Sequence, residues 1–152
     1  MTSWLFAAYI VVIFILNSIS LLDNSSSRAG RAAIYNLIAL FAVAYTGMIV
    51  TTFFVTKSEP NDPVVQFERL IRSQPIIKQQ FVDYIEKHAS YFCSICDTHV
   101  FAGSKHCSIC NRCCYEFDHH GRWVSNDIGR LNYILFIRML LFTMSTLLLQ
   151  LI

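Results

Sequence analysis

The chain has 152 residues, of which 55% are hydrophobic and 14% are charged, which is more apolar than the composition of ordinary soluble domains. A membrane protein is therefore the first expectation. The formal net charge is +2, and this near balance argues against nucleic acid as a partner, because phosphate binding needs a concentrated basic surface.

Two long apolar segments begin the chain. Residues 3–22 carry no charge, and about twenty residues at about 1.5 Å per residue span a hydrocarbon core of roughly 30 Å. A signal peptide is the competing interpretation, but no basic residue precedes the run and the run is long for one. Residues 23–31 are polar and residues 32–56 are apolar again. We therefore predict a transmembrane hairpin over residues 1–56.

A third apolar segment, residues 131–152, is predicted to form a third transmembrane helix. Arg138 lies about two turns into it, and we expect this side chain to extend to the cytosolic interface, the alternative being contact with a phosphate-bearing ligand. The predicted fold is an all-α polytopic membrane protein with a small domain between the second and third spans.

The region between these spans is predicted to be cytosolic. Residues 57–130 hold nine of the chain's twelve Lys and Arg residues, although Arg28 and Arg31 in the short polar loop favour the opposite orientation. The short cysteine spacings of this region suit metal binding rather than disulfides and so indicate a reducing compartment, which favours the cytosolic orientation. Residues 57–90 form a linker in which Ile77, Phe81 and Tyr84 recur at helical spacing. We expect this amphipathic helix to pack against the domain that follows; lying on the membrane surface is the alternative.

Cysteine and histidine cluster in the next segment, residues 91–136. Paired Cys-x2-Cys steps let two thiolates from one tight turn bind a single Zn²⁺, and later ligands complete a tetrahedron. Five cysteines and three histidines, His106, His119 and His120, stand in register, which implies two structural Zn²⁺ ions; without His119 the set is one ligand short. Asp127 can complete the second set, because a carboxylate oxygen also binds zinc. The candidate residues are Cys93, Cys96, His106, Cys107, Cys110, Cys113, His119, His120 and Asp127.

The whole string resembles the cysteine-rich domain of the DHHC family of protein S-acyltransferases, the palmitoyltransferases. It reads Cys93-x2-Cys96-x9-His106-Cys107-x2-Cys110-x2-Cys113-x4-Asp118-His119-His120-Gly121-x5-Asp127-x4-Asn132-x3-Phe136. The resemblance implies one zinc on Cys93, Cys96, His106 and Cys113. It implies a second zinc on Cys107, Cys110, His120 and the position of Asp127.

The resemblance also implies catalytic roles. In the family a motif cysteine takes an acyl chain from acyl-CoA as a thioester and passes it to a protein cysteine. Asp118 and His119 match its partners, a carboxylate that orients the imidazole and a base that activates the thiol. The nucleophile position is occupied by Gly121, so the covalent route is closed. Palmitoyl-CoA would be the cosubstrate if the chain were active.

Other positions also depart from the family pattern. Arg122 replaces the usual proline and Asp127 replaces a zinc cysteine, and the chain stops before the fourth span that the family generally has. Cys114 could replace the lost nucleophile only through a fold-back toward His119; we interpret it as a small buried residue. The alternative route is direct transfer from acyl-CoA to a substrate thiol, with His119 as general base.

We therefore expect a palmitoyltransferase homologue that is inactive, while whether it is an enzyme stays open. The alternative is a zinc scaffold that binds an active family member or its substrates. A membrane-anchored ubiquitin ligase of the RING type is more distant, because the ligand order does not follow its cross-brace pattern. The expected partners are membrane lipid, acyl-CoA and cysteine-bearing membrane proteins, and the expected location is the ER or Golgi membrane.

Overall fold

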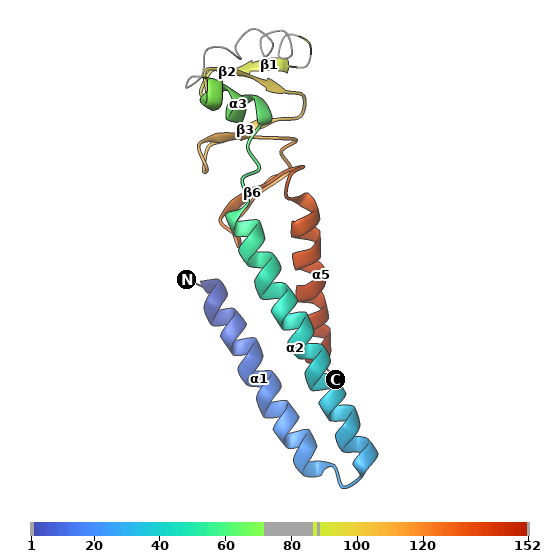
Figure 1. Ribbon diagram of the computed structural model, residues 1–152. Coiled ribbons are helices and arrows are strands. Elements are labelled where there is room, and N and C mark those ends of the chain that lie inside the picture. The colour runs from blue at the N-terminus through green and yellow to red at the C-terminus, as the bar shows by residue number, and fades with distance from the viewer. Residues whose placement is uncertain (1, 72–86, 88, 152) are drawn as a thin grey trace. The chain divides into compact units, whose positions relative to one another are not determined.

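The apolar segments form the long helices of the chain, and the cysteine-rich segment forms short hairpins. The computed structural model describes residues 2–71, 87 and 89–151 (Figure 1). Two units are distinguished, residues 1–53 with 137–152 and residues 54–136. The helices are α1 (Thr2–Asn24), α2 (Arg28–Lys57), α3 (Pro63–Ile71) and α5 (Tyr133–Leu149). The strands are β1 (Ala89–Cys93), β2 (Thr98–Phe101), β3 (Lys105–Cys107), β4 (Arg112–Cys114), β5 (His119–Gly121) and β6 (Asn126–Ile128).

In the first unit, α1 and most of α2 form a helical hairpin (Figure 1). The Ser27 hydroxyl accepts a hydrogen bond from the Gly30 backbone N–H at 3.0 Å and so caps the start of α2. Phe14 and Phe41 stack between the two helices with ring centroids 3.6 Å apart. Gly47 allows α5 to come close, because a Cβ atom there would lie 2.5 Å from the Phe142 ring.

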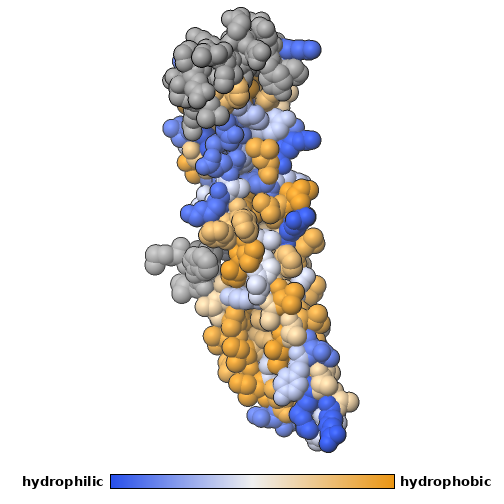
Figure 2. Space-filling model, in the orientation of Figure 1, coloured by the Kyte–Doolittle hydropathy of each residue, from blue (hydrophilic) through white to orange (hydrophobic). Residues whose placement is uncertain are grey.

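Two helices in the described residues are long and apolar enough to cross a membrane, over Ala7–Asn24 and Arg28–Lys57. The prediction of three such helices is corrected by α5, which has 17 residues and a length of about 25 Å. It begins at Tyr133 rather than 131 because Asn132 precedes it in a turn, where the Asn132 side chain accepts from the Gly129 N–H at 3.0 Å. Figure 2 shows apolar side chains over much of the helical unit's visible face.

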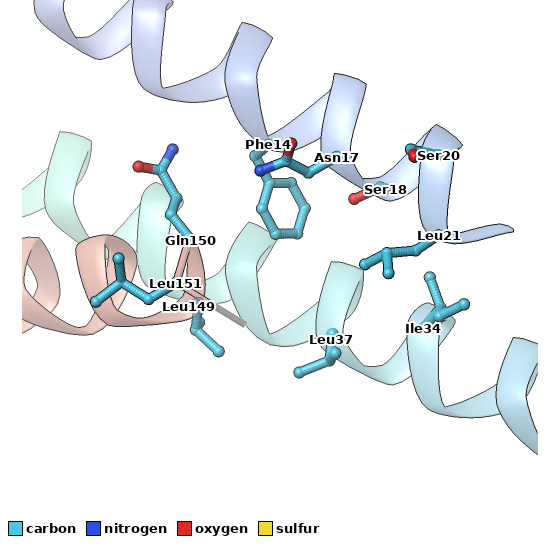
Figure 3. A pocket seen from close by; sticks show the side chains of 10 residues that line it. All are labelled: Phe14, Asn17, Ser18, Ser20, Leu21, Ile34, Leu37, Leu149, Gln150 and Leu151. Atoms are coloured by element: carbon cyan, nitrogen blue, oxygen red, sulfur yellow. The ribbon is translucent and has the colours of Figure 1, made fainter. Parts of the chain in front are cut away.

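A pocket of about 290 Å³ lies within the helical unit. Its lining combines apolar and polar side chains (Figure 3). One of the polar groups is engaged, because the Gln150 amide donates to the Ile10 carbonyl oxygen at 2.7 Å. The lining residues are Phe14, Asn17, Ser18, Ser20, Leu21, Ile34, Leu37, Leu149, Gln150 and Leu151.

The described residues of the second unit form three antiparallel two-stranded hairpins, β1–β2, β3–β4 and β5–β6. An isolated hairpin is marginally stable at best, and the buried core here is small. One buried cluster consists of Val65 from α3 and Val100 from β2, packed with the cysteines Cys93 and Cys113. Helix α3 itself was not predicted, and the amphipathic helix predicted around residues 77–84 lies outside the described residues.

Candidate functional site

The first group of metal-ligating side chains comes from β1, the turn after it, β3 and β4. The Nδ1 atom of His106 lies 3.3 Å from the Cys96 Sγ atom and 3.9 Å from the Sγ atoms of both Cys93 and Cys113. The Sγ atoms of Cys96 and Cys113 are 3.6 Å apart. Four donor atoms therefore lie around one point.

The second group comes from β3, the turn after it, β5 and β6. The Nδ1 atom of His120 lies 3.7 Å from the Cys107 Sγ atom and 3.4 Å from the Cys110 Sγ atom. It lies 2.9 Å from the Oδ1 atom of Asp127. His120 and Asp127 face each other because they are paired in the register of the β5–β6 hairpin.

Both Cys-x2-Cys turns have the same local structure. Each ends in a residue with positive φ, Asp97 at 52° and Asn111 at 50°. Asp and Asn enter this left-handed region more readily than other non-glycine residues. The turn reverses the chain into the second strand of its hairpin, which leaves both cysteines of each pair on the same side of the turn.

The geometry of both groups fits zinc. Tetrahedral coordination with Zn–S of about 2.3 Å and Zn–N or Zn–O of about 2.0–2.2 Å separates ligand atoms by roughly 3.3–3.8 Å. In each group one atom per residue can be chosen so that all four lie within 4.8 Å of one another. The two groups are consistent with two structural zinc ions. They comprise Cys93, Cys96, His106 and Cys113, and Cys107, Cys110, His120 and Asp127.

Asp127 is the one carboxylate among these eight donors. Its side chain is fully buried, with 0% exposure. Burial by itself raises the pKa of this carboxyl, but hydrogen bonds from Cys107, His120, Cys110 and Arg112 outweigh it and leave the pKa below the ordinary value. The Nε atom of Arg112 lies 3.2 Å from the Oδ2 atom. Asp127 is therefore a carboxylate at neutral pH, as a metal ligand must be.

Asp118 and His119 lie together next to the second group. The Nδ1 atom of His119 is 3.1 Å from the Oδ2 atom of Asp118, and their side chains are 45% and 54% exposed. The imidazole also makes an edge contact with the Phe136 ring, with centroids 5.2 Å apart. A carboxylate on Nδ1 holds a neutral imidazole in the tautomer with Nε2 free to accept a proton.

Gly121 ends strand β5 and is buried. A Cβ atom at this position would lie 2.8 Å from the Cγ2 atom of Val124 and 3.3 Å from the Asn126 carbonyl oxygen. Its φ angle is not in the left-handed region, so the backbone itself does not require glycine. The space that a side chain would need is filled by Val124.

Cys114 is completely buried at the end of β4. Burial, followed by the charge of Asp127, raises the pKa of this thiol to about 12. A buried neutral thiol is a poor nucleophile, so this position agrees with the interpretation of Cys114 as a small core residue.

Asp62 joins α3 to the first hairpin through hydrogen bonds, and the sequence did not lead us to predict this role. Its carboxylate accepts from the backbone N–H groups of Val64 at 2.8 Å and Phe101 at 3.0 Å, and from the Ser104 hydroxyl at 2.5 Å. The available signal was Asp62-Pro63, a capping residue followed by proline at the first helical position. Asp62 thus caps α3 and holds the β2 end of the first hairpin.

The sequence profile of the family described as DHHC palmitoyltransferase matches residues 86–152. The yeast protein "Palmitoyltransferase SWF1" is 48% identical over 54 residues, which cover 36% of this chain and 16% of that protein. Bovine "Palmitoyltransferase ZDHHC4" is 58% identical over 40 residues, covering 26% of this chain and 12% of the relative.

A plant relative matches over a longer range. The Arabidopsis thaliana protein "Probable protein S-acyltransferase 13" is 28% identical over 113 residues, 70% of this chain and 37% of that protein. The match thus spans well under half the length of each of these relatives. Together with the two ligand groups, these similarities show that residues 86–152 belong to the DHHC palmitoyltransferase family.

Proposed function

We propose that this chain is a DHHC palmitoyltransferase homologue that does not form an acyl-enzyme and acts as a membrane-bound zinc scaffold. The observation that carries the proposal is Gly121. It stands where the resemblance assigns the nucleophilic cysteine, directly after the Asp118-His119-His120 run. Glycine has no atom that can attack a thioester, so the two-step route through a covalent intermediate has no first step.

The two ligand groups support the scaffold role. In the described hairpins, the buried aliphatic side chains are Val100, Val124 and Ile128, and a domain with so small a core gains folding free energy from metal. Zinc without an open coordination position is structural rather than catalytic. The proposed site residues are accordingly the eight ligands, with Asp118 and His119 beside them.

Membrane attachment is part of the proposal. Helices α1 and α2 have the length and composition to cross a bilayer. Residues 57–130, which contain the zinc ligands, hold nine of the twelve Lys and Arg residues, and this bias supports a cytosolic location for the region. The ER or Golgi membrane is the proposed location.

The proposed partners are an active family member, its cysteine-bearing membrane protein substrates, and acyl-CoA. A second, weaker activity is favoured by the exposed Asp118–His119 pair. The free Nε2 of His119 would take the proton of a substrate thiol, whose sulfur attacks the acyl-CoA carbonyl while the CoA thiolate leaves and is protonated. Lacking the intermediate, this route would be slow.

The test is incubation of the purified chain with a clickable palmitoyl-CoA, followed by scoring of hydroxylamine-sensitive label on the chain. We expect no label on the native chain and none on Cys114→Ser. Label on the native chain that disappears with Cys114→Ser would overturn the proposal and assign the nucleophile to Cys114.

The scaffold role is tested by co-expression with an active palmitoyltransferase. We expect co-purification that is lost with Cys93→Ser, which removes a proposed zinc ligand. Asp118→Asn is the control, because it leaves every proposed ligand in place. Absence of the active enzyme from the native complex would contradict the scaffold role.

A further inference from the structure

Asp127 differs from a cysteine ligand in having two oxygen atoms. Oδ1 faces His120 at 2.9 Å, inside the second ligand group. If Oδ1 binds the metal, Oδ2 remains as a charged acceptor in a side chain with 0% exposure. A buried carboxylate oxygen without a donor is costly, whereas a cysteine ligand has one sulfur atom and leaves no second charged acceptor.

Arg112 supplies the missing donor. Its Nε atom lies 3.2 Å from Oδ2, and its side chain is only 20% exposed. Arg112 follows the positive-φ residue Asn111 in the second Cys-x2-Cys turn and pairs with the ligand Cys107 in the β3–β4 register. The turn that presents two of the metal ligands therefore also presents the guanidinium.

The guanidinium is held on its other side by Asn126. Its Nη2 atom donates to the Asn126 Oδ1 atom, which also accepts from the Asp127 backbone N–H at 2.9 Å. The Asn126 amide nitrogen in turn donates to the Val55 carbonyl oxygen at 2.7 Å, at the last turn of α2. This chain of contacts orients the arginine fork toward Oδ2.

We propose that Arg112 is the positioning residue that makes Asp127 a working metal ligand, by engaging Oδ2 and leaving Oδ1 as the single oxygen presented to the ion. The inference rests on the assignment of zinc to the second ligand group. It implies a conditional dependence: Arg112 matters while residue 127 is a carboxylate and becomes dispensable when that residue is a thiolate.

The experiment compares Arg112→Gln in the native chain and in Asp127→Cys. The full purified chain is titrated with Zn²⁺ against a chromophoric chelator, and with Co²⁺ to record ligand-to-metal absorption. In the native background we expect the second site to lose about 10–100-fold in Zn²⁺ affinity, as removal of outer ligand contacts generally does. In Asp127→Cys we expect no change on adding Arg112→Gln.

The first ligand group provides an internal reference, because its Co²⁺ absorption should stay unchanged in every variant. Arg130→Gln is the matched control: Arg130 also pairs with a carboxylate, Glu116, at 3.0 Å, but on the surface. We expect Arg130→Gln to leave both affinities unchanged. Arg112→Lys keeps the charge without the planar fork and should recover part of the affinity.

Two results would overturn the inference. One is an equal loss of Zn²⁺ affinity on Arg112→Gln in the native chain and in Asp127→Cys, whether one site or both sites are affected. That result would make Arg112 a general structural residue. The other is unchanged affinity of Arg112→Gln in the native background. Loss of both metals only while residue 127 is aspartate would support the inference, since it keeps the conditional dependence.

Discussion

Replacing Gly121 with cysteine would return a thiol to the position beside Asp118 and His119, but the structure predicts a steric cost. The new Cβ atom would lie 2.8 Å from the Cγ2 atom of Val124, so this branched side chain must move. Overpacking of this kind costs about 1–3 kcal/mol. We therefore expect Gly121→Cys to unfold more easily than the native chain and to accept acyl label only weakly.

A second substitution separates the two effects. Val124→Ala removes the contacting methyl groups, so Gly121→Cys with Val124→Ala should regain stability and label more strongly than Gly121→Cys alone. Gly121→Ala is the matched control, since it adds the same Cβ atom without a thiol. It should lose similar stability and take no label. Thermal unfolding followed by zinc release measures the first property, and hydroxylamine-sensitive label from a clickable palmitoyl-CoA measures the second.

The labelling should also depend on His119. Adding His119→Ala to the relieved cysteine variant removes the general base, and we expect labelling to slow by about 10²–10⁴-fold. If the relieved variant keeps both zinc ions and still labels no more than Gly121→Ala, the reasoning is wrong. In that case the loss of the nucleophile is not the main reason for inactivity.

Three further predictions concern the zinc domain. Gly129→Ala should destabilise it by about 1–3 kcal/mol, because the Cβ atom would lie 2.4 Å from the Tyr115 carbonyl oxygen and 2.6 Å from the Cys114 Sγ atom; unchanged thermal unfolding would contradict this. Asp62→Ala should destabilise the domain by at least the cost of a lost helix cap, about 0.5–2 kcal/mol, because it also leaves buried donors unpaired. Amide exchange in α3 and β2 would measure this loss, and Asp62→Asn is the milder control. Burial, followed by Asp127, raises the pKa of the metal-free Cys110 thiol to about 11, so zinc must displace its proton at neutral pH. Zinc affinity should therefore rise with pH, by about tenfold per unit from this thiol alone, and a titration between pH 6 and 8 that shows no such rise would refute it.

Much of this protein could be predicted from residue order because the informative contacts are local. A Cys-x2-Cys step brings two sulfur atoms together within one turn, so its spacing indicates metal without knowledge of the fold. Runs of about twenty apolar residues are predicted to be helical, because a segment that crosses a bilayer must satisfy its own backbone hydrogen bonds. The first residue of α5 was harder to predict, since it depends on the side-chain contacts of Asn132 with Gly129 and Ser58. Helix α3 was missed because its capping signal lies in a segment interpreted as linker.

The ligand types, their spacing and the glycine at position 121 can be read directly from residue order. The surroundings of these residues depend on the folded chain. Val124 fills the space beside Gly121, Cys114 is buried, and Arg112 reaches Asp127 across fifteen residues of chain. Such contacts depend on how separate hairpins pack, and packing is a property of side chains that meet only after folding. The presence of each chemical group is therefore written in the sequence, while its solvation and its partners come from the fold.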